Sequence, residues 1–399
     1  MTKQPMGRLD EIAAALAEAS LDGWLFYDFR HSDPLAYRVL GLPSGGITTR
    51  RWFCYVPATG MPRALVSAVE AERLAALGVE TTIYRSADEM AAALGAILAG
   101  ARRVAMDYSP QCAIPYVARV DAGTVELVSS LGVEVVSAAD LIQRFEARLT
   151  AAQLASHRRA AAVVRRVVEE TFAEIARRLR SAEPVSEYTA QQFVLARFAA
   201  LGVVADDPPI VALNANAALP HFAPSAARDT PVRHGDLVLL DLWAKEPGEE
   251  SIYADLTWMA YAGERVPEEQ ARVFAIVAEA RDAAVDFICK RVHTGAPVRG
   301  EEADRVARGV IERAGFAAHF LHRTGHSIGR EVHGAGANLD SLETRDHRTL
   351  IDRTCFSVEP GIYLPGRFGV RSELNMTIEN GRAEVSAAPA QRQIAALLA

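Results

Sequence analysis

The sequence has little of what several classes of protein depend on. Its 399 residues include only four cysteines and no C-x-x-C pair, which favours a reducing compartment over a disulfide framework. Acidic residues interrupt the apolar stretch near the N-terminus, and no window reaches the ~18 consecutive apolar residues of a membrane span. The net charge of −7 is unlike the basic balance of nucleic-acid-binding proteins. We therefore expect a cytoplasmic protein that binds neither membranes nor nucleic acid.

The first 146 residues alternate between helical and strand-like patterns. At ~150 residues per domain, the chain is long enough for two or three domains. Alternating helices and strands are typical of an α/β domain. The expected strands are residues 23–27, 51–56, 80–84 and 104–106, and the expected helices are residues 8–19, 69–77 and 87–99.

A change of pattern near Ala147 marks the predicted domain boundary. The next segment, residues 151–180, has the apolar spacing of a long amphipathic helix. Beyond it, runs of strands with paired helices indicate an α+β domain with a mainly antiparallel sheet. We therefore predict two domains, residues 1–146 and residues 147–399. The later expected strands are residues 210–212, 237–242, 251–259, 355–358 and 374–378, and the helices are residues 186–201, 267–292 and 300–314.

Two aspartates lie in strand-like segments of the second domain. Asp241 ends an apolar strand, and Asp255 lies in the next one, 255 − 241 = 14 residues later. Pro247 and Gly248 predict a turn between them, so a hairpin would bring the two carboxylates together. Burying such a carboxylate is costly unless it is paired or binds a metal. The alternative is that both lie at strand ends in solvent, since aspartate is a common strand terminator.

Three histidines, His322, His326 and His333, lie within twelve residues, and Gly325 and Gly329 flank the middle one. Glycine lets backbone approach a crowded site closely. Histidine is the commonest nitrogen ligand of metals and a proton carrier at neutral pH. The alternative is a polar loop with ordinary core histidines.

Two glutamates, Glu359 and Glu373, each lie in an otherwise apolar strand near the end of the chain. This position is costly for a carboxylate without a partner. The alternative is a pair of salt-bridged glutamates, with Arg371 as a partner.

Together these segments contribute four carboxylates and one imidazole. One divalent ion would leave a charge of about −2, whereas two would neutralise it. Two ions about 3.5–4 Å apart hold an attacking water and polarise a substrate carbonyl. Oxygen-rich ligation with a single histidine favours Mn²⁺ or similar ions over a thiolate-type zinc site. The residues therefore predict a two-metal hydrolytic site.

These residues closely resemble the pita-bread metallopeptidases, which include methionine aminopeptidase, prolidase, aminopeptidase P and the metal-free creatinase. The family pattern is an Asp ending a strand, a second Asp, a Gly-His loop, a Glu-Pro-Gly strand and an Arg-x-Glu. The metal ligands that the resemblance implies are Asp241, Asp255, His326, Glu359 and Glu373. The match spans roughly residues 150–385.

The preceding α/β segment resembles the N-terminal domain of prolidase, aminopeptidase P and creatinase, which methionine aminopeptidases lack. The resemblance thus implies a creatinase/prolidase-type N-terminal domain in residues 1–146 and a pita-bread catalytic domain in residues 147–399. It also implies a homodimer, since relatives often pair.

The resemblance implies further roles, residue by residue. His221 and His333 resemble histidines that bind the substrate or the transition state, and Glu359 resembles the ligand that also handles the catalytic proton. Arg371 and Arg345 resemble arginines near the substrate carboxylate. The implied reaction is hydrolysis of the Xaa-Pro bond in dipeptides or short peptides. The implied cofactors are two divalent ions, Mn²⁺ first, with Co²⁺ or Zn²⁺ as alternatives.

Two features depart from the family. The gap between Asp241 and Asp255 is longer than usual by about three residues, which we place in the turn at residues 245–250, where insertions are tolerated. Trp258 stands where many relatives have an arginine, which bears on fine substrate preference.

Two other functions are alternatives to a peptidase. A creatinase-like, metal-free hydrolase of a small amidino or amide metabolite is disfavoured because all five ligand types are retained. A non-enzymatic binding module predicts eroded ligands, and the five positions are intact.

Overall fold

The computed structural model describes residues 5–399, and contacts within the chain divide it into two compact units, Met1–Glu146 and Ala147–Ala399. Each unit has its own sheets and its own hydrophobic core. No helix in the described part of the chain is both long enough and apolar enough to cross a bilayer.

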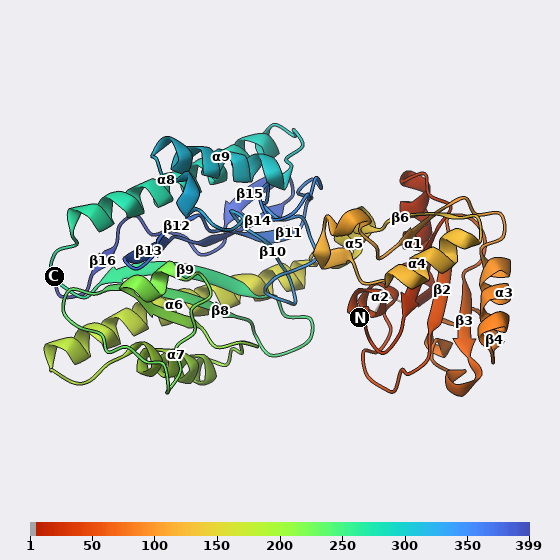
Figure 1. Ribbon diagram of the computed structural model, residues 1–399, viewed down its shortest axis with the longest axis horizontal. Coiled ribbons are helices and arrows are strands. Elements are labelled where there is room, and N and C mark those ends of the chain that lie inside the picture. Colours follow the sequence, from red (N-terminus) through yellow and green to blue (C-terminus); the bar gives the residue numbers. More distant parts are fainter. Residues whose placement is uncertain (1–4) are drawn as a thin grey trace. The chain divides into compact units, whose positions relative to one another are not determined.

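The first unit is built on one six-stranded mixed sheet with the order β4-β3-β2-β1-β5-β6 (Figure 1). Its strands are β1 (Gly23–Asp28), β2 (Trp52–Pro57), β3 (Arg63–Ser67), β4 (Glu80–Tyr84), β5 (Arg103–Met106) and β6 (Glu134–Ser137). Its helices are α1 (Pro5–Glu18), α2 (Pro34–Leu40), α3 (Ala87–Ile97), α4 (Ala122–Ser130) and α5 (Ala139–Ile142). β1 pairs antiparallel with β2 and parallel with β5, so the predicted α/β class is confirmed.

One predicted helix in this unit, residues 69–77, is wrong. Two single-turn 3₁₀ helices, Ala68–Glu70 and Ala75–Leu77, occupy this segment, and β3, which we did not predict, immediately precedes them. The Glu70 carboxylate accepts hydrogen bonds from the backbone and hydroxyl of Thr49 at 2.7 Å, which holds the first turn against a distant loop. Short apolar runs do not distinguish helix from turn, because periodicity needs a longer window.

The second unit contains two four-stranded sheets and a separate hairpin. Their orders are β16-β9-β8-β7, β10-β11-β14-β15 and β12-β13. The strands are β7 (Ile210–Leu213), β8 (Leu237–Ala244), β9 (Ala254–Tyr261), β10 (Ser327–Ile328), β11 (Thr354–Val358), β12 (Gly361–Leu364), β13 (Phe368–Arg371), β14 (Leu374–Glu379), β15 (Arg382–Val385) and β16 (Ala395–Ala396). All neighbouring strands pair antiparallel except β16 and β9, so the predicted α+β class is confirmed.

Two pairs of helices enclose these sheets, α6 and α7 on one side and α8 and α9 on the other (Figure 1). They are α6 (Ala151–Arg180), α7 (Glu187–Leu201), α8 (Glu268–His293) and α9 (Gly300–Arg313). Thr150 and Gln153 form a reciprocal capping box at the start of α6, and Ser186 and Thr189 do the same for α7. The sequence pattern predicted all four helices to within two residues at each end.

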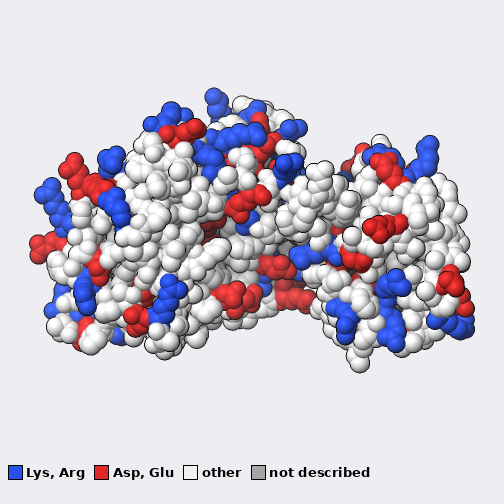
Figure 2. Space-filling view, in the orientation of Figure 1, with Lys and Arg blue, Asp and Glu red and all other residues white. Residues whose placement is uncertain are grey.

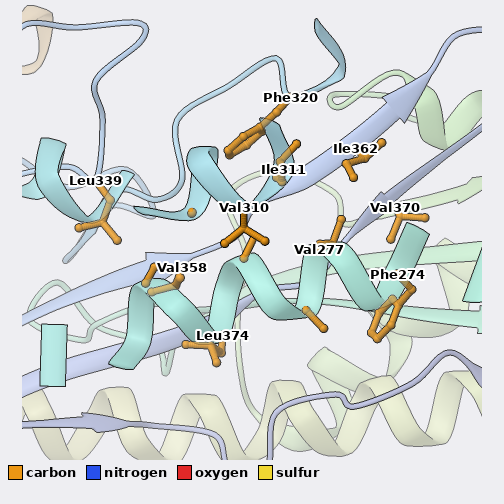
Figure 3. Close-up of a cluster of buried hydrophobic side chains, with 14 of the residues drawn as sticks. Phe274, Val277, Val310, Ile311, Phe320, Leu339, Val358, Ile362, Val370 and Leu374 are labelled. Atoms are coloured by element: carbon orange, nitrogen blue, oxygen red, sulfur yellow. The ribbon is translucent and has the colours of Figure 1, made fainter. Parts of the chain in front are cut away.

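The core under α8 and α9 fixes the position of the strands that carry the acidic residues. Phe274 and Val277 of α8 and Val310 of α9 belong to one buried cluster with Val358, which ends β11, and Leu374, which begins β14 (Figure 3). Glu359 directly follows Val358, and Glu373 directly precedes Leu374. Because burial of apolar side chains stabilises a fold, this packing holds the two strands, and so the neighbouring Glu359 and Glu373, in place.

Candidate metal centre

The β8–β9 hairpin brings Asp241 and Asp255 together. Asp241 pairs with Thr257, and Asp255 lies two residues before Thr257, so all three share one face of the sheet. Both carboxylates are buried, with 8% and 6% of their surfaces exposed. The predicted pairing of the two strands is confirmed, and the alternative of two solvated strand ends is wrong.

His326 lies immediately before β10, beside β11. Its backbone N–H donates to Ser357 Oγ at 3.0 Å, and its Nε2 lies 3.6 Å from Asp255 Oδ2 and 3.4 Å from Glu359 Oε1. The preceding Gly325 packs so closely that a Cβ would lie 2.0 Å from Ser357 O. The expectation that glycine permits a close backbone approach here is confirmed.

The protonation of His326 follows from its surroundings. Nδ1 lies 3.2 Å from the carbonyl oxygen of Ser327, which can only accept, so Nδ1 carries the hydrogen. Nε2 then presents its lone pair to the carboxylates. Burial, followed by the charges of His333 and Arg323, lowers the pKa of His326 well below its usual value. A neutral imidazole aimed at carboxylates is the form that binds metals.

Thr257 ties three of these groups together. Its hydroxyl lies 3.0 Å from Asp241 Oδ1 and 2.9 Å from Glu373 Oε2, and it accepts a hydrogen bond from Arg371 Nε at 2.9 Å. Its carbonyl accepts the Glu373 N–H at 3.1 Å. We did not predict a role for Thr257, although the two-residue period of β9 places it on the same face as Asp255.

The carboxylate cluster has the chemistry of a cation site. Asp255, His326 and Glu373 each offer a ligand atom within 4.8 Å of the others. Asp255 Oδ1 and Glu373 Oε1 are buried and accept no hydrogen bond from any described residue. Such oxygens are costly to bury, and a divalent cation would compensate them. The residues present therefore fit a metal ion.

Burial also shifts how these acids bind protons. The pKa values of Asp255 and Glu373 lie well above their usual range, first because burial disfavours the charged form and then because neighbouring carboxylates repel it. The same effects raise the pKa of Glu359 to about 7, with Arg371 and Arg323 acting in the opposite direction. Without a cation, the cluster thus retains protons near neutral pH.

Arg371 lies inside the cluster. It is 3% exposed, and its guanidinium forms an ion pair with Asp241 and donates to Tyr363 Oη at 3.0 Å. Among the described residues, Arg371 forms its ion pair with Asp241 and not with Glu359 or Glu373, so the alternative in which Arg371 is the salt-bridge partner of the two glutamates is wrong.

The guanidinium also changes the charge count. Four carboxylates and one guanidinium carry −4 + 1 = −3, so one divalent ion would leave −1 and two would leave +1. Charge alone therefore does not decide between one ion and two, contrary to the count made from the acids alone.

The two histidines expected to bind substrate lie beside the cluster. The His333 ring contacts the His326 ring edge-on, with centroids 4.4 Å apart and an interplanar angle of 83°. Burial, then the charges of Arg323 and His221, lower the pKa of His333 to about 4. His221 is exposed and follows Pro220, whose carbonyl lies 3.5 Å from Arg371 Nη1.

Two other residues singled out in the sequence form no hydrogen bond or ion pair with the described residues of the cluster. Arg345 is exposed in the loop between β10 and β11, and it forms no hydrogen bond or ion pair with the described residues of the cluster. Trp258 lies on the opposite face of β9 from Asp255, where the guanidinium of Arg165 stacks over its ring at 4.0 Å. The connection we drew between Trp258 and fine substrate preference is therefore not supported by its position.

Tyr363, for which no role was predicted, contacts His322, the first of the three histidines singled out in the sequence. Tyr363 Oη lies 2.7 Å from His322 Nε2, and His322 Nδ1 lies 2.7 Å from the Arg323 carbonyl. His322 must therefore donate from Nδ1 and accept from the tyrosine, which leaves the tyrosine oxygen to accept from Arg371. This series of hydrogen bonds holds Arg371 against Asp241.

Comparison with known proteins identifies the family. The model of metallopeptidase family M24 matches residues 155–380, which is more than half of the chain and includes every predicted metal ligand. The chain belongs to metallopeptidase family M24. The predicted resemblance to this class of enzyme is thereby confirmed.

Two of the similar proteins are named as dipeptidases. The chain is 35% identical to the Xaa-Pro dipeptidase of Lactobacillus helveticus over 164 residues, 41% of this chain and 40% of that protein. It is 29% identical to the probable dipeptidase PepE of Mycobacterium tuberculosis over 395 residues, 96% of this chain and 94% of that protein. The first match thus spans less than half of the L. helveticus protein, whereas the second runs through both units.

Solved structures agree with the fold. The dipeptidase PepE from Mycobacterium ulcerans has a TM-score of 0.74 at 26% identity, covering 99% of this chain and 98% of that one. The prolidase from Thermococcus sibiricus has a TM-score of 0.68 at 23% identity, covering 99% and 100%. The predicted fold, a creatinase-type α/β domain followed by a pita-bread domain, is confirmed by these full-length likenesses.

The surface adds little to this identification. Acidic and basic side chains are interspersed over the face of the molecule in view (Figure 2). A mixed surface of this kind is ordinary for a globular enzyme.

Proposed function

We propose that this metallopeptidase hydrolyses the Xaa-Pro bond of dipeptides or short peptides with two divalent ions, preferably Mn²⁺. The observation that carries the proposal is the convergence of Asp255, His326 and Glu373, with two buried carboxylate oxygens that accept no hydrogen bond from described residues. The name of the L. helveticus relative supports the substrate class.

Five residues would hold the ions: Asp241, Asp255, His326, Glu359 and Glu373. Asp255 and Glu373 each have one buried oxygen that accepts no hydrogen bond from a described residue, so that oxygen would be available to an ion. Divalent ions at this centre would make a water nucleophilic near neutral pH and polarise the scissile carbonyl.

Glu359 is proposed to move the catalytic proton. Its Oε1 lies 3.4 Å from His326 Nε2, so the carboxylate stands where the ions would bind, and the family resemblance gives this residue the proton-transfer role. Its side chain is 15% exposed, more than the 3% of His326, so a substrate can reach it. We propose that it takes a proton from water and delivers it to the leaving prolyl nitrogen.

His333 and His221 are proposed to orient the substrate. His333 is neutral at pH 7, because its pKa is about 4, so it can donate one hydrogen bond to the oxyanion without adding charge. His221 lies near enough to His333 to affect its pKa, which suits a second contact to the same substrate.

The two arginines are proposed to differ in role. Arg371 donates to Asp241, Thr257 and Tyr363, so any contact it makes with a substrate carboxylate must use the donors left over. Arg345 is exposed, and its guanidinium remains the better candidate for that carboxylate.

The test is a peptide panel with metal-depleted protein. Ala-Pro, Ala-Ala and Ala-Pro-Ala would each be incubated with Mn²⁺, Co²⁺ or Zn²⁺, and released amino acids measured by mass spectrometry. We expect proline from Ala-Pro, with Mn²⁺ most effective. Hydrolysis of Ala-Ala alone would contradict the proline preference, and no hydrolysis with any ion would contradict the proposal.

A further inference from the structure

A fully buried carboxylate lies on α9, outside the proposed ligands. Asp304 is 0% exposed, and its Oδ1 accepts hydrogen bonds from the backbone N–H of Thr324 at 2.9 Å and from its hydroxyl at 2.6 Å. Its Oδ2 accepts the N–H of Ser341 at 2.9 Å and also contacts that residue's hydroxyl. One side chain therefore joins two loops of the catalytic unit.

Arg308, one helical turn later, balances the charge of Asp304. Its Nε and Nη2 lie 3.1 and 3.0 Å from the two carboxylate oxygens. Its Nη2 also donates to the carbonyl of His322 at 2.7 Å, and its Nη1 donates to that of Phe320 at 3.2 Å. The pair thus holds the backbone of residues 320–324 against α9.

The bonded residue Thr324 contacts both sides of the proposed metal centre. It lies two residues before His326, and its carbonyl accepts the N–H of Glu359 at 2.6 Å. Because Asp304 fixes the amide and hydroxyl of Thr324, it also fixes the carbonyl that positions Glu359.

We propose that Asp304 is a positioning residue that sets the spacing of His326 and Glu359 for metal binding through Thr324. The inference rests on the proposed metal centre. Partners outside the ligand shell commonly change metal affinity by about 10–100-fold when they are mutated, because they orient the ligands.

A second buried carboxylate provides a matched control. Glu187 on α7 is 0% exposed and accepts hydrogen bonds from the N–H of Leu213 at 2.7 Å and from Asn216 Nδ2 at 2.9 Å. It holds the segment that leads to His221 and contacts no proposed metal ligand. A Glu187→Gln variant should therefore perturb a buried helix carboxylate without moving the metal centre.

The experiment titrates Mn²⁺ into metal-depleted protein, with the dissociation constant measured by calorimetry and by the electron paramagnetic resonance of free Mn²⁺. Asp304→Asn should weaken binding by about 10–100-fold, because the amide nitrogen would face the donors of Ser341 or Thr324. Thr324→Val, which removes only the hydroxyl, should weaken it less and in the same direction. Glu187→Gln should leave the constant within about twofold, which is well below the 10–100-fold effect of a partner that orients metal ligands.

Thermal unfolding of each metal-depleted variant separates positioning from stability. Unchanged Mn²⁺ affinity in Asp304→Asn, or equal weakening in Glu187→Gln, would overturn the inference. If Asp304→Asn does not fold, Thr324→Val alone decides by the same criterion. Failure of the proposed function would appear differently, as an absence of Mn²⁺ binding by the unaltered protein.

Discussion

Both units bury acidic side chains, but they compensate them differently. In the first unit, burial together with the charge of Asp107 raises the pKa of Asp33 well above its usual range. The pKa of Asp107 rises to about 6, again chiefly through burial. Trp24 Nε1 donates to Asp107 at 2.9 Å, and the N–H of Ala36 donates to Asp33 at 3.1 Å.

In the second unit, four carboxylates meet an imidazole. Among the described residues, each group keeps two buried oxygens without a donor, Asp33 Oδ2 and Asp107 Oδ2 in the first unit and Asp255 Oδ1 and Glu373 Oε1 in the second. One shared proton can satisfy a pair of carboxyl groups, whereas four carboxylates around an imidazole need more positive charge than one proton supplies. Among the described residues, metal-binding side chains of three chain segments converge only in this second cluster. The comparison indicates that a buried acid alone does not mark a metal site, and that convergence with a neutral histidine does.

The largest expected effect comes from removing the imidazole. His326→Ala should weaken Mn²⁺ binding and lower kcat/KM by more than about 100-fold, because even partners outside the ligand shell cost 10–100-fold. His293→Ala, at the exposed end of α8, is the matched control and should leave both values unchanged. Activity retained in His326→Ala would contradict the claim that His326 makes the second acidic cluster a metal site.

The second test uses pH on the metal-depleted protein. Glu359 has a pKa of 4.5 unfolded and about 7 folded, so its contribution to stability is present below pH 4.5 and is lost as pH rises through 7. Thermal melts should therefore show the free energy of unfolding falling by about 3 kcal/mol over this range from this group.

Mn²⁺ should sharpen the contrast between the units. Asp33 and Asp107 also have raised pKa values, so their contribution to the free energy of unfolding is likewise lost as pH rises. Among the described residues, however, only the second cluster offers a cation site. Saturating Mn²⁺ should abolish the fall in the free energy of unfolding that we attribute to Glu359. The fall that comes from Asp33 and Asp107 in the first unit should remain. A melting temperature that Mn²⁺ does not change at pH 7 would contradict the claim that only the second unit has a cation site.

A smaller effect is expected from the two faces of β9. Thr257→Val removes the hydroxyl between Asp241 and Glu373 and should reduce Mn²⁺ affinity by about 10-fold. Trp258→Phe, one residue later on the opposite face, should cost at most about 1 kcal/mol of stability through weaker stacking with Arg165 and should not change the affinity. Equal effects on affinity would contradict the assignment of faces.

The smallest effect is expected in the first unit. Asp107→Asn replaces the shared proton by an amide that can donate to Asp33, so stability should depend less on pH between 4 and 6. Mn²⁺ affinity should stay within about twofold, below the range for partners of a metal site. Calorimetric titration and thermal melts of the same variant check both statements.

Long periodic elements were predictable from the sequence, and pairwise side-chain contacts were not. The helix at residues 151–180 matches α6 because thirty residues of apolar spacing leave little ambiguity. The β8–β9 pairing followed from two apolar runs and a Pro-Gly turn. Residues 69–77 were wrongly predicted as a helix, and the short hairpin β12–β13 was not predicted, because brief apolar runs contain little periodicity.

In the candidate site, too, the sequence identified single residues but not the contacts between them. Its acids and histidine could be named because polar residues in apolar strands are conspicuous. The Arg371–Asp241 ion pair joins residues 130 apart, and the Asp304–Thr324 bonds join α9 to a loop 20 residues later. Such contacts depend on how elements pack, which local pattern does not specify.

The most direct test is a crystal structure of the Mn²⁺-loaded protein with anomalous scattering recorded at the manganese edge. The account predicts two peaks about 3.5–4 Å apart, both within ligand distance of Asp255 and Glu373, with one beside His326. A single peak would contradict the two-ion proposal. Peaks away from these residues, or none, would contradict the assignment of the cluster as a metal centre.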